Sequence, residues 1–211
     1  MDWNKVTNQL KDRKPQIIDS ESYAKFAVLL PLIKVENELH VLFEVRAMEL
    51  RRQPGEICFP GGKVDKTDKN EKAAAIRETM EELGITEQEI QDVTPLDYVV
   101  SPFGTIIYPY FGTITTELDN LKPNDAEVGE LFTTPLSYLQ KVEPDIYSIK
   151  CKMEPEQNFP FHVIPGGVDY EWQARNMEEH FYYYGDKVIW GLTARILHHF
   201  LQLLQKFERN D

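Results

Sequence analysis

The residues best placed to do chemistry are three carboxylates within one helical turn, Glu78, Glu81 and Glu82. At 100° per residue, Glu82 lies about 40° to one side of Glu78 and Glu81 about 60° to the other. Like charges at this spacing repel one another and weaken a helix. A divalent cation would relieve the repulsion, because Mg²⁺ and Mn²⁺ take oxygen ligands from carboxylates, water and phosphate. The cluster therefore indicates either a metal site for a phosphate-containing substrate or a solvated acidic helix face.

The element that must position these carboxylates is a helix over residues 70–83. Ile76, Met80 and Leu83 gather on the face opposite the glutamates, so we expect that face to pack and the acidic face to stay polar. Gly84 is expected to end the helix, because glycine adopts the left-handed conformation at low cost. Arg77 precedes Glu81 by four residues and can brace a carboxylate.

The rest of the chain mixes strands with a few helices and does not alternate them strictly. We expect a helix near the N-terminus and a second amphipathic helix over 193–207. Strands are expected over 24–35, 40–46, 57–59, 96–100, 105–114 and 182–190. This pattern predicts an α/β fold of the α+β kind with a mixed sheet. The whole chain, 1–211, is expected to form a single domain, with 1–22 as an N-terminal extension and 23–207 as the core.

The run from Arg77 to Ile85, RETMEELGI, resembles the second half of the Nudix signature, G-x5-E-x7-R-E-U-x-E-E-x-G-U, where U is a bulky aliphatic residue. Thr79 replaces one aliphatic residue. The first half departs further, because Asp68 follows Gly62 after five residues and lies eight residues before Arg77. Asp68 and Glu71 are therefore both candidates for the first acidic position.

A second element lies upstream, LFEVRAMELRRQPGEICFPGG at residues 42–62. It resembles the pattern L-L-T-x-R-[SA]-x3-R-x3-G-x3-F-P-G-G, which precedes the signature in coenzyme A pyrophosphatases. Phe43 and Glu44 stand where that pattern has Leu and Thr. Members of this subfamily also have the stretched signature with Asp near position 68. The resemblance implies a Nudix-type α/β/α sandwich and a metal-dependent pyrophosphohydrolase.

The resemblance also implies roles for the metal-binding residues. Glu78 and Glu82 would be the principal ligands of Mg²⁺ or Mn²⁺, with Glu81 sharing or supporting them. The carbonyl of Gly62 would complete the ligand set. Glu81 and Arg77 would belong to the catalytic machinery together with a general base.

The general base and the substrate contacts lie outside the helix. Glu127 is the candidate base, with Glu130 in reserve, although an exposed loop acid fits either residue equally well. Arg46 and Arg51 are the candidate phosphate contacts, because arginine suits bidentate phosphate recognition. Gly61 is expected to let the backbone approach the substrate closely. A surface ion pair is the alternative for each arginine, and a strand-ending turn for the glycine.

Other conspicuous side chains are expected to pack. Cys58 has no evident activating partner and reads as part of the core. His198 and His199 lack metal-ligand spacing to other ligating residues. The aromatic residues Tyr182–Tyr184 and Trp190 are typical of strands that pack in a core, with an adenine or pantetheine pocket as the alternative.

Composition narrows the function further. The net charge is -12 with a pI of about 4.9, which argues against a sequence-independent nucleic-acid binder. Two cysteines in 211 residues indicate a reducing compartment. The N-terminus lacks the apolar stretch of a signal peptide, and the longest apolar run, 26–33, is too short to cross a membrane. We therefore expect a cytoplasmic protein with no membrane partner.

The function expected from the resemblance is cleavage of coenzyme A or acyl-CoA to 3′,5′-ADP and (acyl-)4′-phosphopantetheine. One alternative is hydrolysis of another nucleoside diphosphate derivative, such as an ADP-sugar or a dinucleotide. The other is a non-catalytic Nudix module that senses a nucleotide. The expected partner is the small-molecule substrate, and the sequence leaves a homodimer open.

Overall fold

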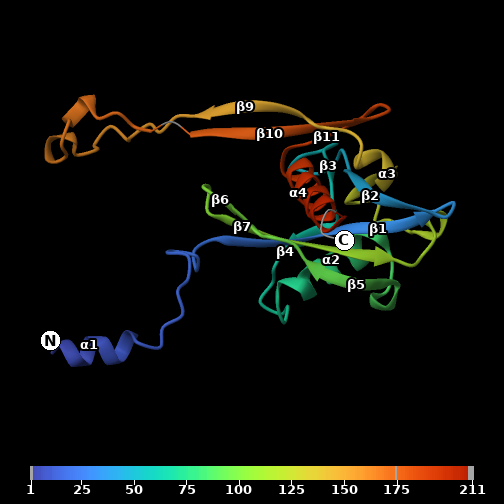
Figure 1. Cartoon of the computed structure of the whole chain (residues 1–211), viewed down its shortest axis with the longest axis horizontal. Coiled ribbons are helices and arrows are strands. Elements are labelled where there is room, and N and C mark those ends of the chain that lie inside the picture. The colour runs from blue at the N-terminus through green and yellow to red at the C-terminus, as the bar shows by residue number, and fades with distance from the viewer. Residues whose placement is uncertain (1, 174, 209–211) are drawn as a thin grey trace.

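The computed structural model describes residues 2–173 and 175–208. A mixed sheet forms its centre (Figure 1). Its strands are β1 (Ala24–Val35), β2 (Glu38–Arg46), β3 (Ile57–Cys58), β4 (Gly61–Lys63), β5 (Ile90–Pro95), β6 (Val99–Ser101), β7 (Thr105–Ile114) and β8 (Val128–Pro135). A second sheet contains β9 (Asp145–Cys151), β10 (Arg175–Tyr184) and β11 (Lys187–Trp190). The helices are α1 (Trp3–Leu10), α2 (Glu71–Leu83), α3 (Leu136–Leu139) and α4 (Gly191–Glu208), with short 3-10 turns η1 (Glu87–Glu89), η2 (Leu118–Asn120), η3 (Phe161–Val163) and η4 (Gly167–Asp169).

Strand β1 organises the main sheet. It runs parallel to β7 and antiparallel to β2 and β4. Its residues alternate between two cores: Leu29 and Ile33 pack with Leu83 of α2, whereas Leu30 and Leu32 pack in the core that includes α4. Both faces of β1 are therefore buried, and the expected α/β/α sandwich with a mixed sheet is confirmed.

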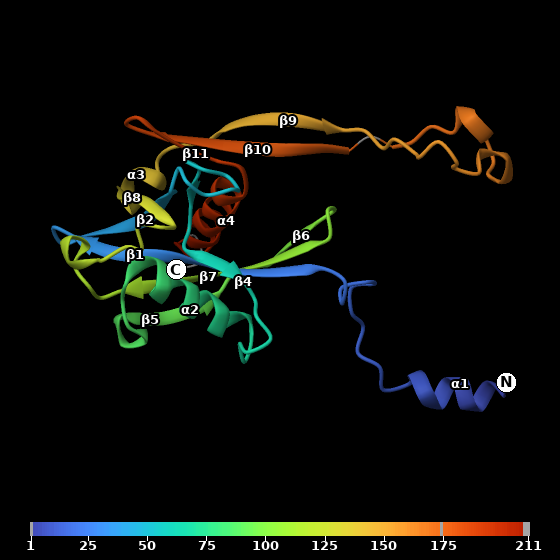
Figure 2. The same ribbon diagram turned by 180° about the vertical axis from the view of Figure 1, so that it is seen from behind.

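The layers can be followed in two opposite views. Helix α2 covers one face of the main sheet, and α4 lies between its other face and the second sheet (Figures 1 and 2). Tyr182 of β10 and Ile189 of β11 are buried in the same core as Phe200 of α4. Of the aromatic residues expected to pack, Tyr182 is therefore buried, whereas Tyr183 and Trp190 are 45% and 42% exposed, so the expectation is wrong for these two.

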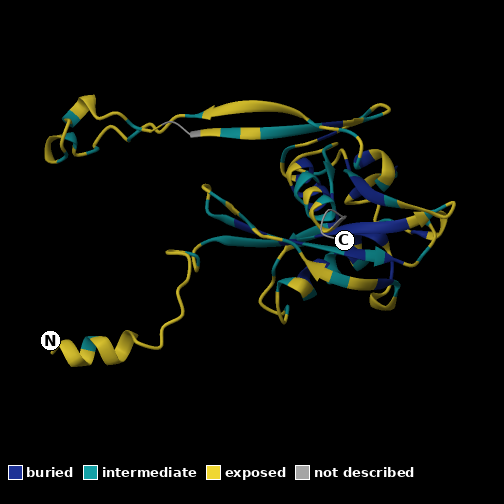
Figure 3. Ribbon diagram, in the orientation of Figure 1, coloured by how far each residue is buried: buried dark blue, intermediate teal, exposed yellow. Residues whose placement is uncertain are grey.

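Two segments extend away from this body. Helix α1 is joined to β1 by an extended stretch, and the chain between β9 and β10 forms a distant tip (Figure 1). Both are largely exposed, whereas the buried residues concentrate on β1, β2 and the inner sides of α2 and α4 (Figure 3). No helix of the described ranges is long and apolar enough to cross a membrane.

The helix that carries Glu78, Glu81 and Glu82 forms where the sequence predicts it. Asn70 caps its start by accepting a hydrogen bond from the Ala73 amide at 2.9 Å. Gly84 ends it with a φ of 66°, in the left-handed region. The strand at 105–114 and the one at 24–35 also match their expected bounds.

Two expected strands differ from the structure, and four strands were not expected. The strand expected at 96–100 forms only from Val99 on, as part of β6; residues 96–98 interrupt the pairing with β7 opposite Pro109, which has no N–H to donate. The strand expected at 182–190 is a hairpin that turns at Gly185, where φ is 60°. Strands β4, β5, β8 and β9 were not expected. Strand β9 is almost entirely exposed and pairs with the distant β10, although Tyr147, Ile149 and Cys151 alternate with Ser148 and Lys150 as in a strand.

Candidate functional site

Two glycines bring backbone directly against the carboxylates of α2. A Cβ on Gly62 would lie 2.3 Å from the carboxyl carbon of Glu78, and one on Gly61 would lie 2.4 Å from the Ala27 carbonyl oxygen. No side chain fits at either position without displacing β1 or Glu78. Strand β4 can therefore lie between β1 and α2 only as a glycine pair, with its backbone groups facing the helix carboxylates.

Glu82 is the most enclosed of the three helix glutamates. Its side chain is buried, and its Oε2 accepts a hydrogen bond from the Gly61 amide at 2.7 Å. Burial raises the pKa of Glu82 to about 8, with the charges of Glu78 and Glu127 adding to it and the Gly61 hydrogen bond opposing it. The expectation that the whole acidic face stays polar is thus wrong for Glu82. That side of the helix faces the sheet, and only Glu81 points to solvent.

Glu78 lies between these extremes. Burial raises its pKa, whereas the hydrogen bond and the charge of Arg77 lower it. Its Oε1 lies 2.9 Å from Arg77 Nη1. Glu78 therefore has one carboxylate oxygen held by an arginine, and its carboxyl group fills the space beside Gly62.

Arg77 holds more than the expected carboxylate. Its Nε and Nη2 donate to the two oxygens of Asp68 at 3.0 and 3.1 Å, and Nη2 also donates to the Lys63 carbonyl at 3.3 Å. Its Nη1 reaches Glu81 at 3.3 Å. The forked pair with Asp68 lowers the pKa of that carboxyl. Arg77 thus ties the loop before α2 to the helix and orients Glu78 and Glu81.

The two candidates for the first acidic position have different partners. Asp68 binds Arg77, and its Oδ2 also accepts from the Asp65 amide at 2.8 Å. Glu71 lies 3.5 Å from the Lys25 amine. Asp68 is therefore the acid that contacts the Arg77–Glu78–Glu81 group, and Glu71 pairs elsewhere.

A carboxylate that the sequence analysis did not assign to the site lies across from α2. Glu44 of β2 is only 2% exposed. Burial raises its pKa well above the ordinary value, and the nearby charge of Glu82 raises it further. The available signal was its departure from the subfamily pattern at the end of an apolar run, but the partner across the interior appears only in the fold.

The two candidate phosphate-binding arginines lie in different surroundings. Arg46 ends β2 directly after a bulge at Val45/Arg46, and its charge lowers the pKa of both Glu44 and Glu82. Its Nε also donates to the Arg52 carbonyl at 3.4 Å. Arg51 lies exposed in the loop between β2 and β3. The structure therefore brings Arg46 to the carboxylates and leaves Arg51 on the surface.

The loop that carries Glu127 is tied to both sides of the site. The Asn124 amide donates to the carbonyl of Glu82 at 2.9 Å, and the Ala47 amide donates to the carbonyl of Glu127 at 2.9 Å. The Glu127 side chain is exposed, accepts from Asn124 Nδ2 at 3.2 Å, and is close enough to raise the pKa of Glu78 and Glu82. Glu130 instead lies 2.6 Å from the Lys187 amine.

Cys58 contributes no nucleophile. It is partly buried, and that burial and the neighbouring charge of Glu44 raise the pKa of its thiol to about 12. A thiol with this pKa carries almost no thiolate at neutral pH. The expectation that Cys58 packs in the interior agrees with this surrounding.

The donors suit a divalent cation, although they are not gathered around one point. Carboxylate oxygens and a glycine carbonyl are the hard ligands that Mg²⁺ prefers. In the described ranges, no three His, Cys, Asp or Glu side chains already surround a common position. One oxygen of Glu44 has no hydrogen-bond partner among the described residues, so the acidic side of the site has an interior acceptor still free. The residues therefore fit a metal by their chemistry.

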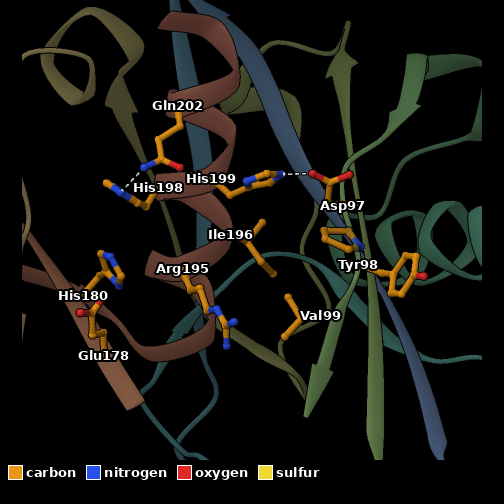
Figure 4. Close-up of a pocket in the computed structure, with 11 residues that line it drawn as sticks. Asp97, Tyr98, Val99, Glu178, His180, Arg195, Ile196, His198, His199 and Gln202 are labelled. Carbon is orange, nitrogen blue, oxygen red and sulfur yellow. Dashed lines mark hydrogen bonds and ion pairs between the residues drawn. The ribbon is translucent and has the colours of Figure 1, made fainter. Parts of the chain in front are cut away.

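A separate hollow of about 370 Å³ lies beside α4 (Figure 4). Its polar side chains bind one another: His199 contacts Asp97 at 3.0 Å, and His198 contacts Gln202 at 3.0 Å. His198 also contacts the Tyr182 hydroxyl at 2.8 Å. Of the described residues that line this hollow, none belongs to α2 or β2. The two histidines therefore have packing partners, as expected.

Comparison with known proteins agrees with the geometry. The NUDIX domain model matches residues 25–153. The mouse peroxisomal coenzyme A diphosphatase NUDT7 is 36% identical over 66% of this chain and 58% of its own length. The human mitochondrial coenzyme A diphosphatase NUDT8 is 32% identical over 86% of this chain and 70% of its own. The Nudix hydrolase NudL of Photorhabdus laumondii is 31% identical over 96% of this chain and 95% of its own.

A solved structure with a similar fold is that of a MutT/nudix family protein from Enterococcus faecalis. It has a TM-score of 0.53 at 15% identity, and the match covers 97% of this chain and 70% of that one. At this identity the likeness concerns the fold alone.

Proposed function

Because this chain belongs to the NUDIX family, we propose that it is a metal-dependent diphosphatase of coenzyme A or acyl-CoA. Membership of this family makes the chain a hydrolase that acts on pyrophosphate bonds. The products we propose are 3′,5′-ADP and (acyl-)4′-phosphopantetheine. The observation that carries the proposal is the enclosed carboxylate of Glu82, which is bonded to the backbone of a glycine pair whose missing side chain makes room for the Glu78 carboxylate.

The metal ligands in this proposal come from two elements. Glu78 and Glu82 of α2 and the Gly62 carbonyl of β4 would hold Mg²⁺ or Mn²⁺, with Glu81 at the solvent side. When bound, the ion would supply positive charge to the diphosphate oxygens and lower the pKa of a coordinated water. Since the protein itself has a net charge of -12, the anionic substrate needs such local positive charge.

The remaining residues would position the metal ligands and the substrate, and one of them would accept a proton. Arg77 would orient Glu78 and Glu81 through its contacts on α2. Gly61 would contact the diphosphate through its backbone, because glycine has no side chain to block the approach. Arg46 would bind a phosphate oxygen of the substrate, with Arg51 as a contact from the exposed loop. Glu127 would accept the proton of the attacking water.

A substrate panel tests the proposal. Purified protein with Mg²⁺ or Mn²⁺ is incubated with coenzyme A, ADP-ribose, NADH and diadenosine polyphosphates, and the products are resolved by chromatography. We expect the highest kcat/KM for coenzyme A or an acyl-CoA. A higher kcat/KM for another compound would make that compound the substrate in place of coenzyme A. No turnover of any compound would favour a nucleotide-sensing module.

Location, domain limits and assembly complete the proposal. We propose a cytoplasmic location and a single domain over 1–211, in which 1–22 is an extension of the core at 23–207. Fractionation of cells and limited proteolysis test these two statements. A homodimer stays a prediction, which sedimentation equilibrium of the purified chain tests.

A further inference from the structure

A carboxylate with an unused oxygen lies inside the protein beside the proposed metal ligands. Glu44 is 2% exposed, and its Oε1 has no hydrogen-bond partner in the described part of the chain. Its Oε2 is 4.0 Å from the sulfur of Cys58, which is a weak donor. Buried carboxylates are normally paired with a cation or bonded to several donors, because leaving them unpaired is strongly unfavourable.

The side chain of Glu44 points toward α2. Successive residues of a strand face opposite sides of the sheet. Leu42 packs in the core that contains Leu83 of α2, whereas Phe43 packs in the core on the other side. Glu44 therefore faces the side of Leu42 and α2. Consistently, Glu82 is the acid whose charge acts most strongly on Glu44.

The described charges around Glu44 do not compensate it. Arg46 is the basic side chain that acts on Glu44, and it also acts on Glu82. Glu127 adds a further negative charge from the loop. Two enclosed carboxylates thus share one guanidinium. A divalent cation supplies the missing charge and accepts oxygen ligands from both sides.

We infer that Glu44 supplies a further carboxylate oxygen to the divalent cation that Glu78 and Glu82 hold. This inference rests on the proposed function, because it concerns the same ion, but it adds a ligand from β2 rather than from α2. Glu44 stands where the resembling pattern has Thr, so this ligand would be a property of chains with an acid at this position.

Metal binding without substrate tests the inference directly. Isothermal titration with Mn²⁺ is carried out on the wild type and on Glu44→Gln, which keeps the size of the side chain and removes its charge. We expect the affinity of the variant for Mn²⁺ to fall by about tenfold or more, the range found when groups that support a metal site are removed. An affinity within a factor of about two of the wild type would overturn the inference.

Glu38→Gln is the matched control. Glu38 lies on the same strand and the same face as Glu44, six residues away, and is exposed at the far end, where Ser137 donates to it. We expect its affinity for Mn²⁺ to equal that of the wild type. An equal loss in both variants would overturn the inference, because it would make the effect one of charge on the strand in general.

Thermal unfolding separates a ligand from a structural residue. In EDTA, we expect Glu44→Gln to unfold at a temperature no lower than the wild type, since it removes an unpaired buried charge. Added Mn²⁺ should raise its Tm less than it raises that of the wild type. A lower Tm in EDTA with a full increase on adding Mn²⁺ would overturn the inference and leave Glu44 a structural role.

A crystal structure of the wild type tests the inference without requiring that a variant folds. In a crystal structure with Mn²⁺ located by anomalous scattering, we expect a Glu44 oxygen in the coordination sphere; an ion held without Glu44 overturns the inference. Failure to hydrolyse coenzyme A would sink the proposed substrate and leave this inference standing. Absence of Mn²⁺ binding by the wild type would overturn both the inference and the metal dependence.

Discussion

Carboxylates in two regions of this molecule are held in opposite ways. Glu89, at the turn after α2, accepts hydrogen bonds from the Thr86 amide and hydroxyl at 2.8 and 2.7 Å and from the Thr116 hydroxyl at 2.5 Å. These bonds lower its pKa to about 2. Glu82 and Glu44, between α2 and β2, are buried with few donors, and burial raises the pKa of both. The carboxylate is thus held by several donors at Glu89, whereas Glu82 has the Gly61 amide as a donor and one oxygen of Glu44 has no hydrogen-bond partner among the described residues.

The difference in hydrogen-bond donors distinguishes a structural carboxylate, Glu89, from a candidate site carboxylate, Glu82. At Glu89 the protein supplies its own donors, so the carboxylate completes the connection between η1 and the chain after β7. At Glu82 the protein supplies a single amide, from Gly61, and surrounds the carboxylate with other acids. A buried carboxylate with so few internal donors is typical of a metal or substrate site, where the missing partner comes from outside the chain.

The largest expected effect is that of Glu82→Gln on turnover. Removal of the charge should lower kcat/KM for coenzyme A by at least about 100-fold, because loss of groups that merely support a metal site already costs 10–100-fold. Steady-state kinetics with saturating Mg²⁺ measure this loss. Glu89→Gln is the matched control, with expected activity close to that of the wild type. Equal activity of the two variants would erase the distinction between the two regions.

The same substitution, Glu82→Gln, is not expected to lower the stability of the protein. In EDTA at pH 8, Glu82→Gln is expected to unfold at a temperature no lower than the wild type, since a buried charge is removed while the side chain keeps its size. Differential scanning calorimetry measures this. A clear loss of stability would mean that the charge of Glu82 is already compensated within the protein.

Arg77→Lys sharpens the role of the arginine that holds the acids in place. Lysine keeps the charge but cannot make the forked contact with Asp68 while reaching Glu78. We expect the apparent Mg²⁺ affinity to fall by about 10-fold, with little change in KM for coenzyme A at saturating metal. Activity measured across a Mg²⁺ titration gives both values. A change confined to KM would instead assign Arg77 to the substrate.

Arg46→Lys tests the one arginine that the fold brings to the acids. A hydrogen bond to a charged group contributes about 1.5–3 kcal/mol, so losing one bidentate contact should raise KM by about 10-fold or more. Arg51→Lys, on the exposed loop, should have a smaller effect. Steady-state kinetics give the KM of both variants. A larger increase in KM for Arg51→Lys than for Arg46→Lys would make Arg51 the main phosphate contact.

The smallest effect is expected at Glu89, and it depends on pH. The folded-state pKa of about 2 lies below the ordinary value of 4.5, so the contribution to stability is fully present above about pH 4.5. It is lost as the pH falls toward 2. Glu89→Gln should therefore have a lower Tm than the wild type at pH 7, and this difference should shrink below about pH 4.5. A difference independent of pH would show that the ionised form is not what matters.

The sequence predicts the helix of the site well because its signals are local. Asn70 at the start and Gly84 at the end define α2, and the acidic run carries the chemistry. A helical wheel, however, gives angles and not neighbours. It could not show that Glu82 faces the Gly61 amide, since that contact depends on β4 entering between β1 and α2.

Contacts between residues far apart in the chain could not be predicted from the sequence. The pairing of Asp68 with Arg77 depends on the path of the loop, and the approach of Glu44 to Glu82 depends on the packing of β2 against α2. The sequence of β9 alternates Tyr147, Ile149 and Cys151 with Ser148 and Lys150, but its pairing with β10 across residues 152–174 has no local signal. Local patterns therefore predicted many of the elements, whereas β4, β5, β8, β9 and the interior contacts appeared only in the fold.

Hydrolysis of coenzyme A by the wild type, measured with increasing Mg²⁺ and again after adding EDTA, tests the central claim most directly. The account predicts no turnover in EDTA and saturable turnover with Mg²⁺. The products should be 3′,5′-ADP and 4′-phosphopantetheine in equal amounts. Turnover that persists undiminished in EDTA, or the absence of turnover at every Mg²⁺ concentration, would contradict it.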